Sequence, residues 1–439
     1  MHQLFPPSVS DRVSTRNSPQ NNRLSSTAIP RRRSTNLCRL TPSEVGRPPG
    51  DRACQAADDR AGRPAGLAGG GCARAVVLAE EIGRVRIITL NQPRRLNVLS
   101  IDVVVLLAKL LEKWEKDDAA ELILIKGSGR AFSAGGDLKI FYDGRTSRDP
   151  SVELFYRMYW LCYHIHTYKK TQVALAHGIS MGAGASLMVL FSVVTERTVF
   201  ATPEASFGFD TDCSFSYIYS HLPGHLGEFL GLTGARLSGE ELVAAGLATH
   251  FVPSEKLPEL QSRLISLNSG EENAVKSVIE EFSINVQLDE NSILNKKATI
   301  DECFSKDSVE EILASFEAEA GKEGNEWILP FLKSLKRSSP TALKIILQSI
   351  REGRKQNLSE CLKKEFRITM NILRTAISGD VYEWDPPTLE AVDAGKIDLV
   401  FWPFEEDLEL KIPTGDDNRW EGKYEDSPYG ISKSLKSHL

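Results

Sequence analysis

Two glycine-rich turns carry the residue types that could do chemistry in this chain. The first turn is Arg130–Asp137 (RAFSAGGD), and the second, about fifty residues further on, is His177–Ala185 (HGISMGAGA). Because glycine has no side chain, the backbone at such a turn can approach a ligand closely and direct its N–H groups at it. Two turns that converge on one carbonyl oxygen would form an oxyanion hole, which stabilises charge developing on that oxygen. The alternative is that these glycines only allow strands and helices to pack tightly.

Two carboxylates follow the turns at a spacing that also indicates catalysis. Glu204 comes directly after Pro203, and Asp212 falls eight residues later, beyond Gly208. A fixed carboxylate could activate a water molecule or attack an acyl carbon as a nucleophile. Two carboxylates in one cleft would push their pKa values apart. The alternatives are a solvated glutamate at a strand end and a loop that Asp210 and Asp212 make acidic for solubility.

Strands must position these turns, because apolar runs rich in β-branched residues precede both of them. Strands are predicted over the residues 84–90, 122–126 and 173–176, with a fourth built from 193–195 and 198–200. Helical spacing of apolar residues predicts helices over 152–168 and over 100–115, the latter capped by Ser100. Strands that alternate with helices indicate a largely parallel sheet. A ligand should then lie beyond the carboxyl ends of the strands, where both glycine turns fall.

The pattern becomes helical from about Pro258 onward. One helix is predicted over 309–320, with Ser308 and Glu311 as a capping box. Another begins at Ser339-Pro340, where serine is the cap and proline takes the first helical position. A further helix is predicted over 357–374. These helices divide the chain into a predicted core of residues 76–257 and a mainly helical region of residues 258–439.

The bulk composition is that of an ordinary soluble protein. The chain has 439 residues, of which 41% are hydrophobic and 26% are charged, so a sizeable core can form. It holds no run of about 18 apolar residues, so no transmembrane helix is expected. The seven cysteines occur singly and form no Cys-x-x-Cys pair, which argues against a structural zinc site and favours a reducing compartment.

The charge is divided unevenly between the leader, residues 1–75, and the rest of the chain. The leader holds twelve Arg, no Lys and five acids and so carries +7; because the whole chain carries −6, residues 76–439 carry −13. An acidic body argues against a nucleic-acid partner. The leader also lacks apolar periodicity, so we predict that it is disordered. The alternative is a low-complexity leader with no function.

Two targeting signals give different locations. The Arg-rich leader is typical of an organelle transit peptide, which predicts a mitochondrial location. The C-terminal tripeptide Ser437-His438-Leu439 is a permissible variant of the Ser-Lys-Leu peroxisomal signal, which is the second option.

The order of these motifs resembles the crotonase (enoyl-CoA hydratase/isomerase) superfamily and, within it, the plant-type 3-hydroxyisobutyryl-CoA hydrolases. The resemblance runs from about Val77 to about Glu409. Besides the two turns and Pro203-Glu204, the matching segments are Asn91–Ser100, Leu232–Leu237, Gly246–Pro253, Ser339–Lys344 and Trp384–Leu389. The resemblance implies an α/β fold, with a crotonase-like ββα superhelix as the core and a C-terminal helical region.

The resemblance also assigns roles to residues of this chain. The backbone N–H groups of Gly136 and Ala183 would form the oxyanion hole, although the family usually has glycine at the second position. Glu204 would be the main catalytic residue, and Asp212, preferred to Asp210, would hold the substrate hydroxyl or assist proton transfer. The neighbouring residues Gly135, Asp137 and Gly182 would bind substrate. The basic residues Arg94, Arg95 and Lys139 could face the CoA phosphates, or each could be an ordinary surface charge.

The implied reaction is hydrolysis of a 3-hydroxyacyl-CoA thioester, in the family's role 3-hydroxyisobutyryl-CoA to 3-hydroxyisobutyrate and CoA in valine breakdown. No metal and no cofactor beyond the CoA of the substrate are implied, and the acyl-CoA is the expected partner. The superfamily often forms trimers or hexamers, so a homo-oligomer is one option. Hydratase or isomerase activity is disfavoured, because Ser186 stands where hydratases carry their second glutamate.

Departures from the family pattern favour another alternative, an acyl-CoA-binding paralogue with little or no turnover. Ala183 is one departure, and Met158 stands where relatives often carry a glutamate. Asp210 replaces a residue that is usually aromatic or histidine. Two segments are shorter than in relatives: the 23-residue step from Met181 to Glu204 by about two residues near Leu190, and the junction Glu383-Trp384 by about fifteen.

Overall fold

The computed structural model describes residues 75–140, 150–188, 190–374, 386–404 and 409–412. The leader up to residue 74, the tripeptide Ser437-His438-Leu439 and the junction at Glu383 lie outside the described residues. The domain boundaries expected from the sequence stay predictions.

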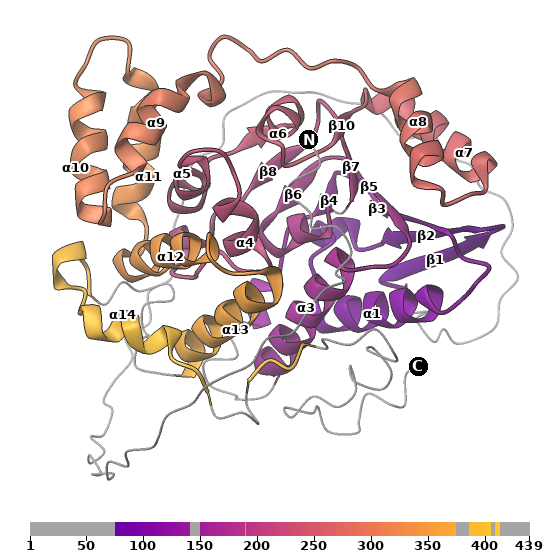
Figure 1. Cartoon of the computed structure of the whole chain (residues 1–439), viewed down its shortest axis with the longest axis horizontal. Coiled ribbons are helices and arrows are strands. Elements are labelled where there is room, and N and C mark those ends of the chain that lie inside the picture. Colours follow the sequence, from indigo (N-terminus) through magenta and orange to yellow (C-terminus); the bar gives the residue numbers. More distant parts are fainter. Residues whose placement is uncertain (1–74, 141–149, 189, 375–385, 405–408, 413–439) are drawn as a thin grey trace, which may run out of the picture. The chain divides into compact units, whose positions relative to one another are not determined.

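Two β-sheets form the centre of the described chain (Figure 1). The larger sheet has the strand order β1-β2-β3-β5-β7-β10, and only its β1–β2 pair is antiparallel. Its strands are β1 Val77–Ile82, β2 Val85–Leu90, β3 Leu122–Gly127, β5 Thr171–Ala176, β7 Phe191–Val194 and β10 His250–Phe251. The smaller sheet has the order β4-β6-β8-β9, with only β8–β9 antiparallel. Its strands are β4 Ala131–Ser133, β6 Ile179–Met181, β8 Val199–Ala201 and β9 Leu237–Ser238.

The chain alternates between the two sheets, because three parallel strands of the larger sheet each lead directly into a strand of the smaller one. The successive pairs are β3 and β4, β5 and β6, and β7 and β8. A helix or helical turn follows each pair, so the predicted ββα superhelix is confirmed. The prediction of one fourth strand was wrong: its two pieces are β7 and β8, which lie in different sheets. A tight turn separates them, in which the Thr198 N–H donates to the Thr195 carbonyl at 2.9 Å.

Apart from the edge strand β1, the larger sheet is buried on both faces, as its continuous apolar runs require. Alternate residues of the strands enter different cores, because successive side chains point to opposite faces. Ile88 and Ile123 belong to the main core with helices α1 (Ile101–Glu115) and α3 (Pro150–His166). Their neighbours, including Ile87 and Leu124, belong to a second core with α7 (Leu257–Leu267) and α8 (Glu272–Phe282).

The remaining helices cover the smaller sheet and build the C-terminal region. They are α4 Phe215–Ser220, α5 Leu226–Thr233, α6 Gly239–Ala245, α9 Lys297–Phe304, α10 Val309–Ala320, α11 Leu329–Arg337, α12 Pro340–Gly353, α13 Leu358–Arg374 and α14 Ala394–Phe401. The capping box of Ser308 and Glu311 at α10 is confirmed. The Ser339 hydroxyl accepts from the Ala342 N–H at 3.0 Å and so caps α12 as predicted. Ser100 occupies the N-cap position of α1, but its side chain makes no capping hydrogen bond.

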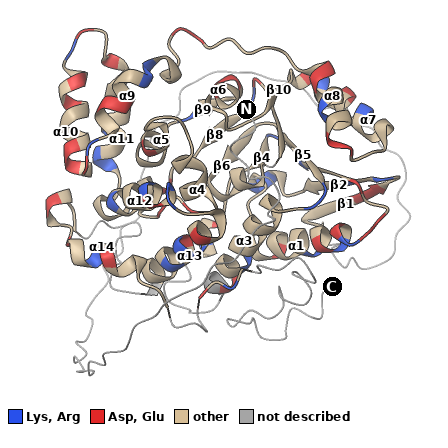
Figure 2. Cartoon of the chain, viewed as in Figure 1, with Lys and Arg blue, Asp and Glu red and all other residues tan. Residues whose placement is uncertain are grey.

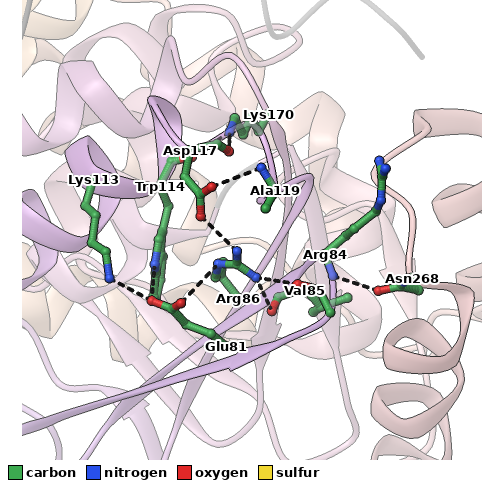
Figure 3. A network of polar contacts seen from close by, with 11 residues as sticks. Glu81, Arg84, Val85, Arg86, Lys113, Trp114, Asp117, Ala119, Lys170 and Asn268 are labelled. Atoms are coloured by element: carbon green, nitrogen blue, oxygen red, sulfur yellow. Dashed lines mark hydrogen bonds and ion pairs between the residues drawn. The ribbon is translucent and has the colours of Figure 1, made fainter.

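Charged side chains lie mostly at the surface, and Figure 2 shows β5, β6 and β8 free of them. Arg86 on β2 is an exception, because it is buried and pairs with Asp117 at 2.8 Å (Figure 3). The same network ties the start of β2 to the end of α7, where the Arg84 N–H donates to the Asn268 side chain at 2.7 Å. Within the described residues, no helix combines the length and the hydropathy needed to cross a bilayer.

Candidate active site

One cavity of about 370 Å³ brings together every site residue expected from the sequence. These residues are Gly135, Gly136 and Asp137 from the first turn, Gly182 and Ala183 from the second, and the two carboxylates Glu204 and Asp212. They come from four separate segments of the chain, so the superhelix rather than local sequence assembles the site. The roles given to them remain predictions.

The first turn contains the short strand β4, and after that strand Gly135 adopts a left-handed conformation with φ at +99°. The Leu99 N–H donates to the Gly135 carbonyl at 2.8 Å, which fixes the backbone just before Gly136. A Cβ atom at Gly135 would lie 2.9 Å from the Met181 carbonyl oxygen and 3.7 Å from the Ala183 nitrogen. The two glycine-rich turns are therefore in contact, and only glycine allows this approach.

The second turn begins the 3-10 helix Gly182–Leu187 directly after β6. Ala183 is the second residue of this helix, so its N–H precedes the first intrahelical hydrogen bond. Gly136 lies in no helix, and within the described part of the chain its N–H has no hydrogen-bond partner. The two N–H groups predicted to form an oxyanion hole thus lie on turns that are in contact.

Glu204 lies against the second turn. It begins the 3-10 helix Glu204–Phe207 after β8, and a Cβ atom at Gly182 would lie only 2.7 Å from its Oε1 atom. The side chain is buried, and among the described residues its Oε2 atom has no hydrogen-bond partner. Burial, with a smaller effect of Asp212, raises the pKa of Glu204 to about 8. Such a carboxyl can exchange a proton near neutral pH, as a catalytic base must.

Asp212 also lines the cavity and has a hydrogen-bond partner of its own. The Tyr159 hydroxyl on α3 donates to its Oδ2 atom at 2.7 Å. Burial raises the pKa of Asp212 to about 6, and the Tyr159 hydrogen bond acts in the opposite direction. Asp210 is buried but does not line the cavity, and burial together with the Asp212 charge holds its pKa well above the usual range. The two aspartates are therefore not equivalent, and Asp212 is the one placed to meet a ligand.

The rest of the cavity wall is mainly apolar. It includes Val98, Leu99, Leu154, Phe155, Met158, Met181, Phe207 and Phe209. Met158 thus brings a thioether where relatives often carry a glutamate. Ser186 is buried outside the wall, and its hydroxyl donates to the Ala183 carbonyl at 2.7 Å. Ser186 therefore supplies no second carboxylate that could bind a water molecule beside Glu204, as hydratases are expected to need.

The basic residues expected near CoA differ in their placement. Lys139 lines the cavity, whereas Arg94 is an exposed surface residue. Arg95 pairs with Asp137 at 2.5 Å, so the Asp137 carboxylate is already occupied by a neighbouring cation. Among the described residues, no group of three or more His, Cys, Asp and Glu side chains is placed to hold a metal ion.

Sequence reasoning missed three residues behind the carboxylates: Tyr159, Glu365 and Thr369. Tyr159 sits between Asp212 and Thr369, and Glu365 accepts hydrogen bonds from the loop after Asp212. A weak signal was present, because Glu365 and Thr369 are polar residues four apart on the apolar, buried face of α13. Nothing local in the sequence connects that face to Asp212.

Known proteins share much of this sequence and its fold. A model of the enoyl-CoA hydratase/isomerase family matches residues 85–401. The chain is 66% identical over 371 residues to 3-hydroxyisobutyryl-CoA hydrolase-like protein 5 of Arabidopsis thaliana, covering 81% of this chain and 96% of the relative. It is 38% identical to the mitochondrial 3-hydroxyisobutyryl-CoA hydrolase of Homo sapiens, covering 68% of this chain and 78% of the relative.

A solved structure extends the agreement to three dimensions. Carnitinyl-CoA dehydratase of Mycobacterium thermoresistibile superposes with a TM-score of 0.70 at 29% identity, covering 77% of this chain and 99% of that protein. The two touching glycine turns, the paired strands and the matched sequence span agree with one another, and the chain belongs to the enoyl-CoA hydratase/isomerase family.

Proposed function

We propose that this protein hydrolyses the thioester of a 3-hydroxyacyl-CoA, with 3-hydroxyisobutyryl-CoA as the substrate and 3-hydroxyisobutyrate and CoA as products, in the breakdown of valine. The observation that carries the proposal is the placement of Glu204, a buried carboxyl packed against the turn that presents the Ala183 N–H. The names of the two hydrolase relatives support the choice of substrate.

The geometry supports a simple mechanism. The thioester carbonyl oxygen accepts hydrogen bonds from the N–H groups of Gly136 and Ala183, which stabilise the tetrahedral oxyanion. The ionised Glu204 either attacks the carbonyl carbon, giving a mixed anhydride and CoA thiolate, or removes a proton from the attacking water. In the first route water then hydrolyses the anhydride, which releases the hydroxy acid and regenerates Glu204; in the second, water adds directly to the acyl carbon. In both routes the C–S bond breaks and the thiolate takes up a proton. Asp212 accepts a hydrogen bond from the 3-hydroxyl and orients the substrate.

These steps need positioned donors and a base, so no metal or redox cofactor is proposed beyond the CoA that the substrate brings. Hydratase or isomerase chemistry is not favoured, because the Ser186 hydroxyl is bonded to the Ala183 carbonyl and cannot replace a carboxylate.

Thiol release by the purified full-length protein tests the proposal. With 3-hydroxyisobutyryl-CoA and a thiol reagent, the wild type should release CoA well above background, and Glu204→Gln should lower kcat by at least about 100-fold. Asp212→Asn should also lower it. Asp210→Asn is the matched control, since Asp210 is buried without lining the cavity and an amide has nearly the same shape as a carboxyl group; it should keep most of the activity. No release by folded wild-type protein would reject the hydrolase.

Ala183 motivates the second function, an acyl-CoA-binding protein with little turnover, because its methyl group stands beside the acyl position where the family usually has glycine. Calorimetric titration with 3-hydroxyisobutyryl-CoA separates the two. Binding without thiol release, and release gained by Ala183→Gly, would establish the binding paralogue.

We also propose that the protein acts in mitochondria, since the human relative is named mitochondrial and the leader is Arg-rich. Fusing residues 1–75 and the C-terminal residues ending in Ser437-His438-Leu439 separately to a fluorescent reporter tests this location. The leader fusion should enter mitochondria. A cytosolic leader fusion together with a peroxisomal C-terminal fusion would establish the alternative.

A further inference from the structure

Helix α13 sends two polar side chains toward the loop that carries Asp212, although more than 140 residues separate them in the sequence. Glu365 and Thr369 lie one helical turn apart and both are fully buried. Between them they make four hydrogen bonds to the loop and to Tyr159. Polar side-chain atoms are rarely buried without a hydrogen-bond partner. These contacts therefore determine which face of α13 packs against the loop and Tyr159.

Thr369 begins a chain of hydroxyl groups that ends at Asp212. The Tyr159 hydroxyl donates to the Asp212 Oδ2 atom at 2.7 Å and lies 2.6 Å from the Thr369 Oγ1 atom. Because a phenol has one hydrogen and gives it to the carboxylate, the Thr369 hydroxyl is the donor in the second bond. The hydrogen bond from Thr369 to the Tyr159 oxygen polarises the phenol and strengthens its hydrogen bond to Asp212, and both bonds are buried. Tyr159 is thereby held on the carboxylate in one orientation.

Glu365 holds the backbone immediately after Asp212. Cys213 and Ser214 have φ values of +57° and +80°, the left-handed region that non-glycine residues adopt only at a cost. The Glu365 carboxylate accepts from the Ser214 N–H at 2.9 Å and from the Ser216 N–H and hydroxyl at 3.0 and 2.6 Å. It therefore does the work of an N-cap for α4, whose own N-cap serine makes no side-chain capping bond.

We propose that Tyr159, Thr369 and Glu365 are positioning residues that set the place and orientation of Asp212, so that helix α13 completes the active site from a distance. The α13 helix is itself anchored, because the Lys364 ammonium group donates to the Ser349 carbonyl on α12 at 2.5 Å. The effect on catalysis rests on the proposed function, but the effect on the loop does not.

Several ionisable groups surround Asp212 and can contribute to any pH dependence that is measured for it. They come from α3, from the loop that carries Asp212, from the 3-10 helix that begins at Glu204 and from α13. These groups are Tyr159, Cys162, Glu204, Asp210, Cys213, Lys364 and Glu365. Substituting Tyr159 and Thr369 changes hydrogen bonding without removing any carboxylate from this group.

Tyr159→Phe tests the bond to Asp212. It should lower kcat about tenfold or more with KM within about twofold, the range expected for a hydrogen bond to a charged group. Because the Tyr159 bond lowers the pKa of Asp212, its loss should also move the lower break in the pH profile of kcat/KM to higher pH. Tyr168→Phe is the matched control, since it deletes a 2.8 Å hydroxyl bond to the Leu111 carbonyl. Equal kinetics for the two variants would overturn the role of Tyr159.

Thr369 separates a hydrogen-bonding role from a packing role. Thr369→Val has the same shape but no donor, so it should reproduce part of the Tyr159→Phe loss and its pH shift. Thr369→Ser keeps the hydroxyl and should restore both toward the wild-type values. A serine variant as impaired as the valine variant would mean that only packing matters at this position.

Glu365→Gln tests the loop without any need for activity. An amide keeps only one acceptor oxygen and turns its N–H groups toward the donors of either Ser214 or Ser216. The strained turn should therefore open more often and expose Cys213, which is buried. Alkylation of Cys213, followed by peptide mapping in the folded full-length protein, should become at least about tenfold faster than in the wild type. An unchanged rate would overturn the anchoring role even if the chain proves to be a hydrolase. Faster labelling in a chain that releases no thiol would uphold the anchor and reject only the proposed function.

Discussion

Gly182 in the second turn can be no residue other than glycine without cost, for two separate reasons: its backbone conformation and its contact with Glu204. Its φ is +49°, and a Cβ atom there would lie 2.7 Å from the Glu204 Oε1 atom. Gly182→Ala should therefore push the carboxylate out of its place and lower kcat at least about tenfold, because small misplacements of a reacting group are costly. The thiol-release assay measures this change.

The backbone cost of alanine at positive φ must be separated from the clash with Glu204. Gly324 supplies the control, since its φ is +83° and no heavy atom lies within 4 Å of the position its Cβ would take. Gly324→Ala should lose stability by about 1 kcal/mol through backbone strain and keep the wild-type kcat. If both alanines reduce kcat equally, the Gly182 effect is general destabilisation rather than displacement of Glu204.

At the scale of elements, the long helices and the buried strands were predictable because their signals are local. Helices α10 and α12 begin where Ser308 and Ser339 predict, since a capping side chain is read from neighbouring residues. The strands β2, β3 and β5 follow from β-branched runs long enough to show their pattern.

The short strands were missed, or in the case of β8 not separated from β7, for a physical reason. Strands β4, β6 and β8 have three residues each, and β9 and β10 have two, so none contains enough residues for an alternating pattern. Non-local pairing defines them, as in the Ile179–Val199 and Phe200–Leu237 pairs. The edge strand β1 was missed because its residues after Val77 are exposed and include two glutamates, which suits an unpaired edge but hides the strand.

The same distinction between local and distant information applies to the site. The seven residues predicted to form it sit in recognisable turns, and the structure gathers them into one cavity. The contacts of Asp212 could not be predicted, because Tyr159 lies 53 residues before it and Glu365 contacts the loop from 149 and 151 residues away. Only the packing of α13 against α3 and α4 brings these side chains together.

At the scale of the whole molecule, the buried carboxyl groups of the candidate site should make the free energy of unfolding depend on pH. Burial raises the pKa of Glu204 to about 8, of Glu365 to about 7 and of Asp212 to about 6. The unfolded chain releases these protons near pH 4 to 4.5. Between those values the folded state binds more protons than the unfolded state, so stability must fall as pH rises, by up to about 1.4 kcal/mol per pH unit for each group.

Thermal unfolding of the full-length protein should therefore show a higher Tm at pH 5.5 than at pH 8.5. Glu204→Gln removes one buried group that must ionise, so its Tm should exceed that of the wild type by a small margin at pH 5.5 and by a larger margin at pH 8.5. Glu323→Gln, at an exposed surface position, controls for the loss of one charge and should run parallel to the wild type. A Glu204→Gln curve parallel to the wild type would show that Glu204 titrates alike in the folded and unfolded chains. The expected divergence would instead mean that the protein gives up stability at neutral pH to keep an ionisable carboxylate in an apolar cavity.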